Sequence, residues 1–195
     1  MKAISILVLS VILLSSCRNP GKDIVAYAKD KENGLRKEIK AGMMVYDFQY
    51  RPKAYTLKME QLQEGTAAYK ERSRALDGTI WINISFHVEG SGQSPLRYGA
   101  GSLEEYTQRQ DYYLNQAVKD ITLTYGGTNL YPASYWFENN QNLAAHETMI
   151  VAFALPDREN TPGKDITVSF RDQVFNNGII KTTFKKEDLL EVADL

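Results

Sequence analysis

The side chains that most often serve as nucleophiles, bases or metal ligands are scarce here: the 195-residue chain has one cysteine, Cys17, and two histidines, His87 and His146. A zinc site needs three or four converging ligands, and a serine hydrolase needs a base and an orienting acid beside its nucleophile. The sequence has neither a spaced ligand set nor the G-x-S-x-G motif of a nucleophilic serine. We therefore expect no metal, no cofactor and no enzymatic activity, with both histidines as ordinary surface or strand-edge residues.

A hydrolase is the least favoured hypothesis. The acidic residues are scattered, with Glu104 and Glu105 in "SLEEY" and Asp172 in "FRDQ". Hydrolytic chemistry would require Glu104, Asp172 and one histidine to converge in a single cleft.

The N-terminal segment explains the single cysteine. Lys2 precedes a mostly apolar run at residues 4–14, which is typical of a secretory signal peptide and shorter than the roughly 20 residues of a membrane-spanning helix. The stretch "LSSC" that ends at Cys17 then resembles the bacterial lipobox. This resemblance implies cleavage before Cys17, a diacylglyceryl thioether on its sulfur and an acyl chain on its new amine. At about 0.8 kcal/mol per buried methylene, several acyl chains anchor a protein to a membrane permanently.

The residues after Cys17 bear on location. In proteins with a lipobox, an Asp at the next position often implies retention at the inner membrane, whereas this chain has Arg18. No acidic cluster of the kind linked with surface export follows. We therefore expect an outer-membrane lipoprotein that faces the periplasm, with a signal peptide at residues 1–16, a tether at 17–23 and one domain at 24–195.

The charge distribution argues against a nucleic-acid partner. The chain has 23 Lys and Arg against 24 Asp and Glu, and a formal net charge of −1. Binding to a phosphate backbone needs clustered basic residues, but here they alternate with acidic ones, as in "KDKENGLRKEIK". The expected partners are the membrane, through acyl chains on Cys17, and an envelope protein or glycan.

Alternation of apolar and polar residues predicts a mainly β body. The stretch "TIWINISFHV" (79–88) places every second residue from Ile80 to Val88 on an inward face, and His87 on the outward face. Further strands are expected at residues 36–40, 43–50, 120–125, 148–156, 165–172 and 178–186. The first two form a hairpin, the strand at 148–156 is apolar on both faces, and the last pairs with the strand before it across the turn signal "NNG".

Helical signals are fewer. Ser102 and Glu105 form a capping box ahead of a helical pattern. Residues 55–76 are ambiguous between strand and helix, and the C-terminus predicts a short helical turn. We expect an immunoglobulin-like antiparallel β-sandwich with one or two helical insertions, although the Cys–Trp–Cys hallmark is absent; the alternative is an open α+β sheet.

Four stretches of the body resemble a family as well. They are "KENGLRKEIKAG", "VYDFQYRPKAY", "YPASYWFENN…MIVAFALP" and "VFNNGIIKTTFKKEDL". Together they resemble uncharacterised lipoproteins of Bacteroidetes-type bacteria. This resemblance implies lipoprotein location and carries no activity.

Aromatic clusters are the remaining candidates for ligand or partner contact. The stretches "DYYLN" and "LYPASYWFENN" are rich in aromatic rings, and we single out Tyr131, Tyr135 and Trp136. Exposed rings of this kind serve sugar stacking and protein interfaces, while the alternative is that most of them fill the core. The leading hypothesis is a lipid-anchored envelope protein with a non-enzymatic binding or structural role. The second is a carbohydrate-binding module that uses the Tyr131, Tyr135 and Trp136 rings.

Overall fold

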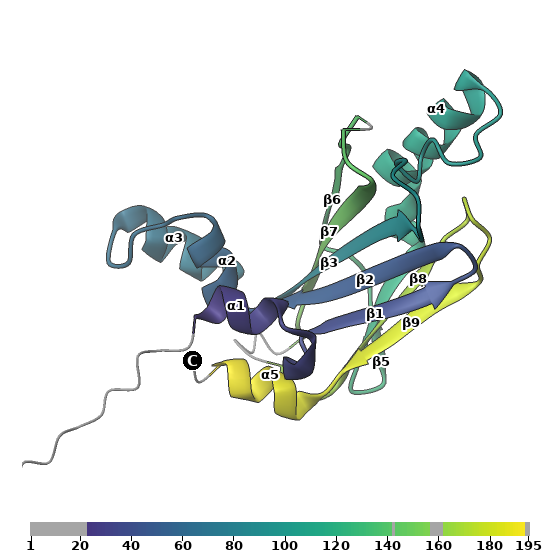
Figure 1. Ribbon diagram of the computed structural model, residues 1–195. Coiled ribbons are helices and arrows are strands. Elements are labelled where there is room, and N and C mark those ends of the chain that lie inside the picture. The colour runs from purple at the N-terminus through teal and green to yellow at the C-terminus, as the bar shows by residue number, and fades with distance from the viewer. Residues whose placement is uncertain (1–22, 142, 157–161, 194–195) are drawn as a thin grey trace, which may run out of the picture.

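Two antiparallel sheets form the body of the protein (Figure 1) in the computed structural model, which describes residues 23–141, 143–156 and 162–193. The five-stranded sheet has the order β1-β2-β3-β7-β6, and the four-stranded sheet has the order β5-β4-β8-β9. The strands of the first are β1 (Arg36–Ala41), β2 (Met44–Arg51), β3 (Thr79–Val88), β7 (His146–Ala154) and β6 (Ser134–Glu138). Those of the second are β5 (Thr128–Leu130), β4 (Ile121–Tyr125), β8 (Ile166–Arg171) and β9 (Ile179–Phe184).

The two sheets pack face to face around an aromatic core. Tyr46 of β2 meets Phe170 of β8 at a ring-centroid distance of 6.2 Å, and Tyr50 meets Phe184 of β9 at 6.3 Å. Along β3, burial alternates residue by residue, because every second side chain points into the space between the sheets. The mainly β, sandwich-like architecture expected from alternation is confirmed.

The hairpins follow their turn signals. β1 and β2 pair from Ala41 opposite Met44, so Gly42 and Met43 form a two-residue turn in which Gly42 has φ +59°. A positive φ at the first turn position matches the right-handed twist of the flanking strands and favours glycine. β9 pairs with β8 as expected, and Gly178 precedes it with φ +76°.

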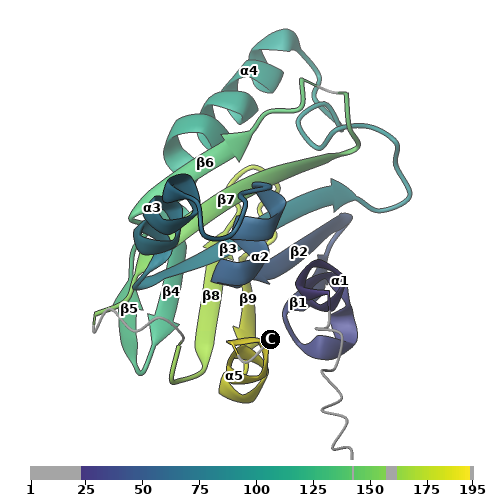
Figure 2. The same ribbon diagram turned by 90° about the vertical axis from the view of Figure 1, so that its left-hand side faces the viewer.

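The ambiguous segment at residues 55–76 is helical. It forms α2 (Lys53–Met59) and α3 (Ala67–Leu76). Pro52 occupies the position before α2, and Thr66 caps α3 by accepting a hydrogen bond from the Tyr69 N–H at 3.2 Å. Both helices lie over one end of the outer face of the five-stranded sheet (Figure 2).

The remaining helices lie at the two ends of the sandwich. α1 (Ile24–Lys29) and α5 (Lys186–Ala193) lie at one end, and α4 (Leu103–Asp111) projects from the other (Figure 1). Short helical turns η1 (Lys31–Asn33), η2 (Tyr112–Gln116) and η3 (Ala117–Asp120) connect α1 to β1 and α4 to β4. The expected cap of α4 is confirmed, since Ser102 Oγ accepts from the Glu105 N–H at 3.1 Å. In the described part of the chain, no helix has both the length and the hydropathy to cross a bilayer.

Candidate ligand-binding face

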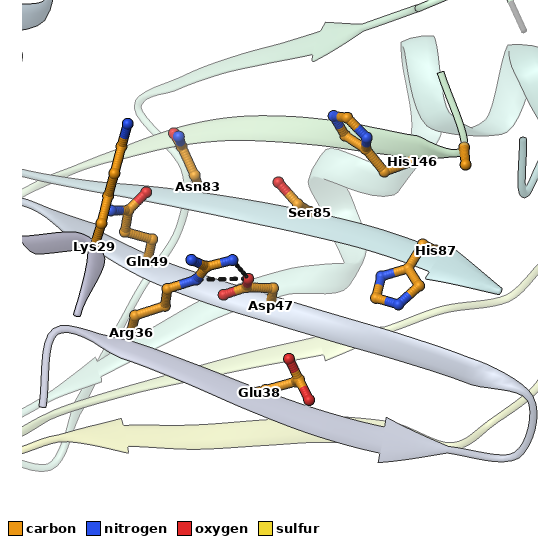
Figure 3. Close-up of a pocket in the computed structure, with 10 residues that line it drawn as sticks. Lys29, Arg36, Glu38, Asp47, Gln49, Asn83, Ser85, His87 and His146 are labelled. Atoms are coloured by element: carbon orange, nitrogen blue, oxygen red, sulfur yellow. Dashed lines mark hydrogen bonds and ion pairs between the residues drawn. The ribbon is translucent and has the colours of Figure 1, made fainter. Parts of the chain in front are cut away.

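The outer face of the five-stranded sheet carries a polar hollow of about 440 Å³ (Figure 3). It is lined by Lys29, Arg36, Glu38, Asp47, Gln49, Asn83, Ser85, His87, Ala145 and His146. Strand register explains how residues so distant in sequence meet. Asp47 stands opposite Ser85, Gln49 opposite Asn83, and His87 opposite His146. Partners directly opposite each other project from the same side of a sheet.

An ion pair lies at the centre of this hollow. Arg36 Nε donates to Asp47 Oδ2 at 2.7 Å, and Arg36 Nη2 donates to the same oxygen. This hydrogen bonding raises the pKa of the Arg36 guanidinium. The Asp47 side chain is 12 % exposed, and its second oxygen, Oδ1, is buried without a hydrogen-bond partner among the described residues. A buried acceptor without a donor is costly.

Amides tie the hollow to its surroundings. Gln49 Nε2 donates to the Ala28 carbonyl at 3.1 Å and so fastens α1 to β2. Asn83 Oδ1 accepts from Arg51 Nη1 at 3.3 Å. These contacts hold both amide planes in place, while no interaction within the described residues engages Asn83 Nδ2 or Gln49 Oε1.

The serine and the two acids of the hollow are bonded to groups other than histidine. Ser85 Oγ and Thr148 Oγ1 are 2.9 Å apart, Asp47 accepts from Arg36, and Glu38 accepts from Lys31. A nucleophilic serine would instead bond a base that an acid orients. The arrangement is that of a polar recognition surface.

Three side chains of the hollow are free to meet a ligand. Within the described ranges, no hydrogen bond or ion pair engages the side chains of Lys29, His87 or His146. Figure 3 shows Lys29 at one end of the hollow and the two histidines at the other. Their separation lets one elongated ligand contact both ends.

The same face continues beyond the hollow. Along one row, Asn83 stands opposite Ile150, and Ile150 stands opposite Trp136 of the edge strand β6. Trp136 is 67 % exposed. Near the start of β3, Arg72 of α3 lies over the Trp81 ring, with its Cζ atom 5.5 Å from the ring centroid. This contact bounds the face beneath α3.

The aromatic residues singled out from the sequence do not share one environment, because neighbouring residues of β6 point to opposite faces of the sheet. Trp136 points outward, whereas Tyr135 is partly buried against the core and its hydroxyl donates to the Tyr113 carbonyl. Tyr131 is 69 % exposed, in the connection between β5 and β6. Tyr112 and Tyr113 belong to the core. Cys17 lies outside the described residues.

The acids considered for hydrolysis lie in different places. Glu104 is exposed on α4. Asp172 is buried between the sheets, where it accepts from Tyr46 Oη at 2.7 Å and Tyr113 Oη at 2.9 Å. His87, on the outward face of β3, is separated from both. The described residues contain no group of three or more His, Cys, Asp or Glu side chains that could hold a metal ion.

Sequence reasoning had missed most of this hollow. Singly, these residues attract no attention. The order β1-β2-β3 brings Arg36, Asp47, Gln49 and Asn83 together, and the packing of α1 on β2 adds Lys29. The available signal was that the outward positions of β1, β2 and β3 are mostly polar, with Val45 and Trp81 as exceptions.

The chain was also compared with known proteins. No protein-family model, curated protein or solved structure matches it.

Proposed function

We propose that this protein is a lipid-anchored protein of the bacterial cell envelope with a non-enzymatic binding role, and that the outer face of its five-stranded sheet is the binding face. The observation that carries the proposal is the polar hollow on that face, with Lys29, His87 and His146 unengaged by other described residues. Binding sites combine a concave surface with a few positioned polar groups. Here the amides of Gln49 and Asn83 are held in place by neighbouring hydrogen bonds, and both side chains line the hollow.

The anchor rests on the sequence. The lipobox-like stretch that ends at Cys17 supports acylation, Arg18 supports an outer-membrane destination, and the periplasmic side is proposed with it. We assign the sandwich to the immunoglobulin-like type as part of the same proposal.

A second candidate function is carbohydrate binding through the exposed Tyr131 and Trp136 rings, without Tyr135, which packs against the core. The observation that favours it is the exposure of Tyr131 and Trp136, at 69 % and 67 %. Large rings left in water on a folded domain are suited to stacking on a ligand.

The anchor is tested by replacing the thiol. Cys17→Ala should release the protein from membranes or leave it unprocessed, and should abolish labelling by a radioactive fatty acid. Ser16→Ala keeps a small residue before the cysteine and should retain the membrane fraction. An unmodified Cys17 sulfur in the intact mass of the mature protein would overturn the anchor.

The binding face is tested by photo-crosslinking in living cells. A diazirine-bearing amino acid at His146 should give a covalent adduct, detected by mass spectrometry. The same residue at the exposed Lys181, on the four-stranded sheet, should give none. Adducts only at Lys181, or at neither position, would contradict this face. Turnover of glycan or ester substrates that Ser85→Ala abolishes would contradict the non-enzymatic role.

A further inference from the structure

The charged side chains of the hollow leave one charge unpaired. Asp47 pairs with Arg36, Glu38 pairs at 2.7 Å with Lys31, which lies outside the hollow, and Lys29 makes no ion pair with another described residue. A site for a phosphate or a polyanion would need several clustered positive charges, and a site for a cation would need surplus acidic groups. One unpaired lysine supplies neither, which favours a ligand without net charge.

The hydrogen-bonding groups of the hollow suit hydroxyl groups. Amide groups present both donors and acceptors, and each imidazole offers two nitrogens for hydrogen bonding; the hollow contains Gln49, Asn83, His87 and His146. The Arg36 side chain, which is 37 % exposed, adds donors for stronger, charge-assisted hydrogen bonds. Because a hydroxyl both donates and accepts, a polyhydroxylated ring can satisfy many of these groups together.

The size and the neighbouring ring point to more than one sugar unit. About 440 Å³ lies within the range of small-molecule sites, about 300–1,000 Å³. Trp136 lies on the same face, two strands away from Asn83 by way of Ile150. Two inter-strand spacings are about 10 Å, which a ligand of two or three linked rings spans. An exposed indole offers a flat apolar surface for stacking.

We propose that this face binds a neutral oligosaccharide that runs across the strands, with one sugar ring in the hollow beside Asn83 and another stacked on Trp136. The proposal rests on the proposed function and names its ligand class. It differs from the cluster of exposed rings considered above, because it includes the polar hollow and excludes Tyr131.

The first step of the test uses the full-length protein, extracted from membranes in detergent and applied to an array of neutral and acidic glycans. Binding to neutral oligosaccharides is expected. Isothermal titration with the neutral oligosaccharide of strongest signal then provides the reference Kd for variants.

Two pairs of variants separate this face from other surfaces. Trp136→Ala and Asn83→Ala should each weaken binding about tenfold, a change of about 1.4 kcal/mol, because each removes a side chain that stacks on or hydrogen-bonds the ligand in this arrangement. Two control variants lie away from the proposed site. Tyr131→Ala removes a ring that is as exposed as that of Trp136, and Asn129→Ala removes an exposed amide from β5. The Kd of both variants should stay within about twofold of the reference Kd. If Asn83→Ala does not fold, Lys29→Ala replaces it, because this exposed side chain has no partner in the described residues.

The outcomes are distinct. The inference is overturned if no neutral glycan binds, if only acidic glycans bind, or if Tyr131→Ala weakens binding while Trp136→Ala does not. An array without binding, together with a protein adduct at His146, overturns the inference and leaves the proposed function standing. An unacylated Cys17 overturns the anchor and leaves glycan binding to be judged by the titration.

Discussion

Removing one hydroxyl from the core is expected to destabilise the protein measurably. Tyr113 is fully buried, and its hydroxyl lies 2.9 Å from Asp172 Oδ2 and 3.0 Å from Oδ1. The same carboxylate accepts from Tyr46 Oη and from the backbone N–H groups of Val174 and Phe175. Tyr113→Phe keeps the ring, which stacks against core aromatics, and removes one of these donors.

The magnitude follows from the charge of the acceptor. A hydrogen bond to a charged group contributes about 1.5–3 kcal/mol, more than a neutral one. We expect Tyr113→Phe to lower the free energy of unfolding by about 2 kcal/mol, which in a domain of this size lowers Tm by roughly 4–8 °C. Tyr131→Phe, at an exposed ring, should change stability by less than about 0.5 kcal/mol.

The penalty should also depend on pH. Burial raises the pKa of Asp172 above its ordinary 3.8, and the hydrogen bond from Tyr113 opposes that rise. Between its ordinary pKa and its folded pKa, the Asp172 carboxyl of the folded protein therefore holds a proton that the unfolded chain has already released. The stabilisation that comes from this bound proton is full below the ordinary pKa of Asp172 and is lost as pH rises through its folded pKa. Without the Tyr113 hydroxyl the folded pKa rises further, so the penalty should be larger at pH 7 than at pH 4.

The assay is urea unfolding of the full-length protein in detergent, followed by circular dichroism at both pH values. Asp172→Asn, which removes the ionisable group, should make the Tyr113→Phe penalty independent of pH. Equal penalties at pH 4 and pH 7 in the protein that retains Asp172 would refute the account based on a buried carboxylate.

Three further changes have defined outcomes. Gly34→Ala should lower stability by about 2 kcal/mol in urea unfolding, because Gly34 has φ +73° and an added Cβ would lie 2.0 Å from the Asp188 carboxylate; Gly92→Ala, where the added atom meets open space, should be nearly neutral. Ser102→Ala should cost about 1 kcal/mol through loss of the α4 cap, and hydrogen exchange should accelerate in the first turn of that helix. Glu147→Gln should reduce the loss of stability between pH 4 and pH 7, because burial raises the pKa of this carboxyl above 4.5 and its contribution is likewise lost as pH rises.

Strands with one polar face could be predicted closely from the sequence. The stretch at residues 79–88 coincides with β3, because alternation over ten residues leaves a single register that buries all five apolar side chains. The strand at 148–156 was expected to be apolar on both faces, and β7 is internal to its sheet.

Other elements were decided by contacts that no local pattern contains. Residues 55–76 carry both helical and strand-like spacing, and the outcome depends on packing over the five-stranded sheet, where Arg51 and Arg72 lie over aromatic rings. The strand β6 was not predicted, because its run of three aromatic residues hides the alternation between inward Tyr135 and outward Trp136. α1 was also missed; Asp23 caps this short helix and pairs with Lys58 of α2 at 2.9 Å.

The position of the hollow connects the proposed anchor to the proposed ligand. Six residue steps separate Cys17 from Asp23, and a fully extended chain of that length spans at most about 20 Å. Asp23 caps α1, Lys29 at the end of α1 lines the hollow, and Gln49 fastens α1 to the sheet. An acylated Cys17 would therefore keep the binding face near the bilayer while α4 projects from the other end of the sandwich. With that anchor, a ligand for this face would have to reach a site near the membrane surface, and a slender neutral oligosaccharide would do so more readily than a bulky folded partner.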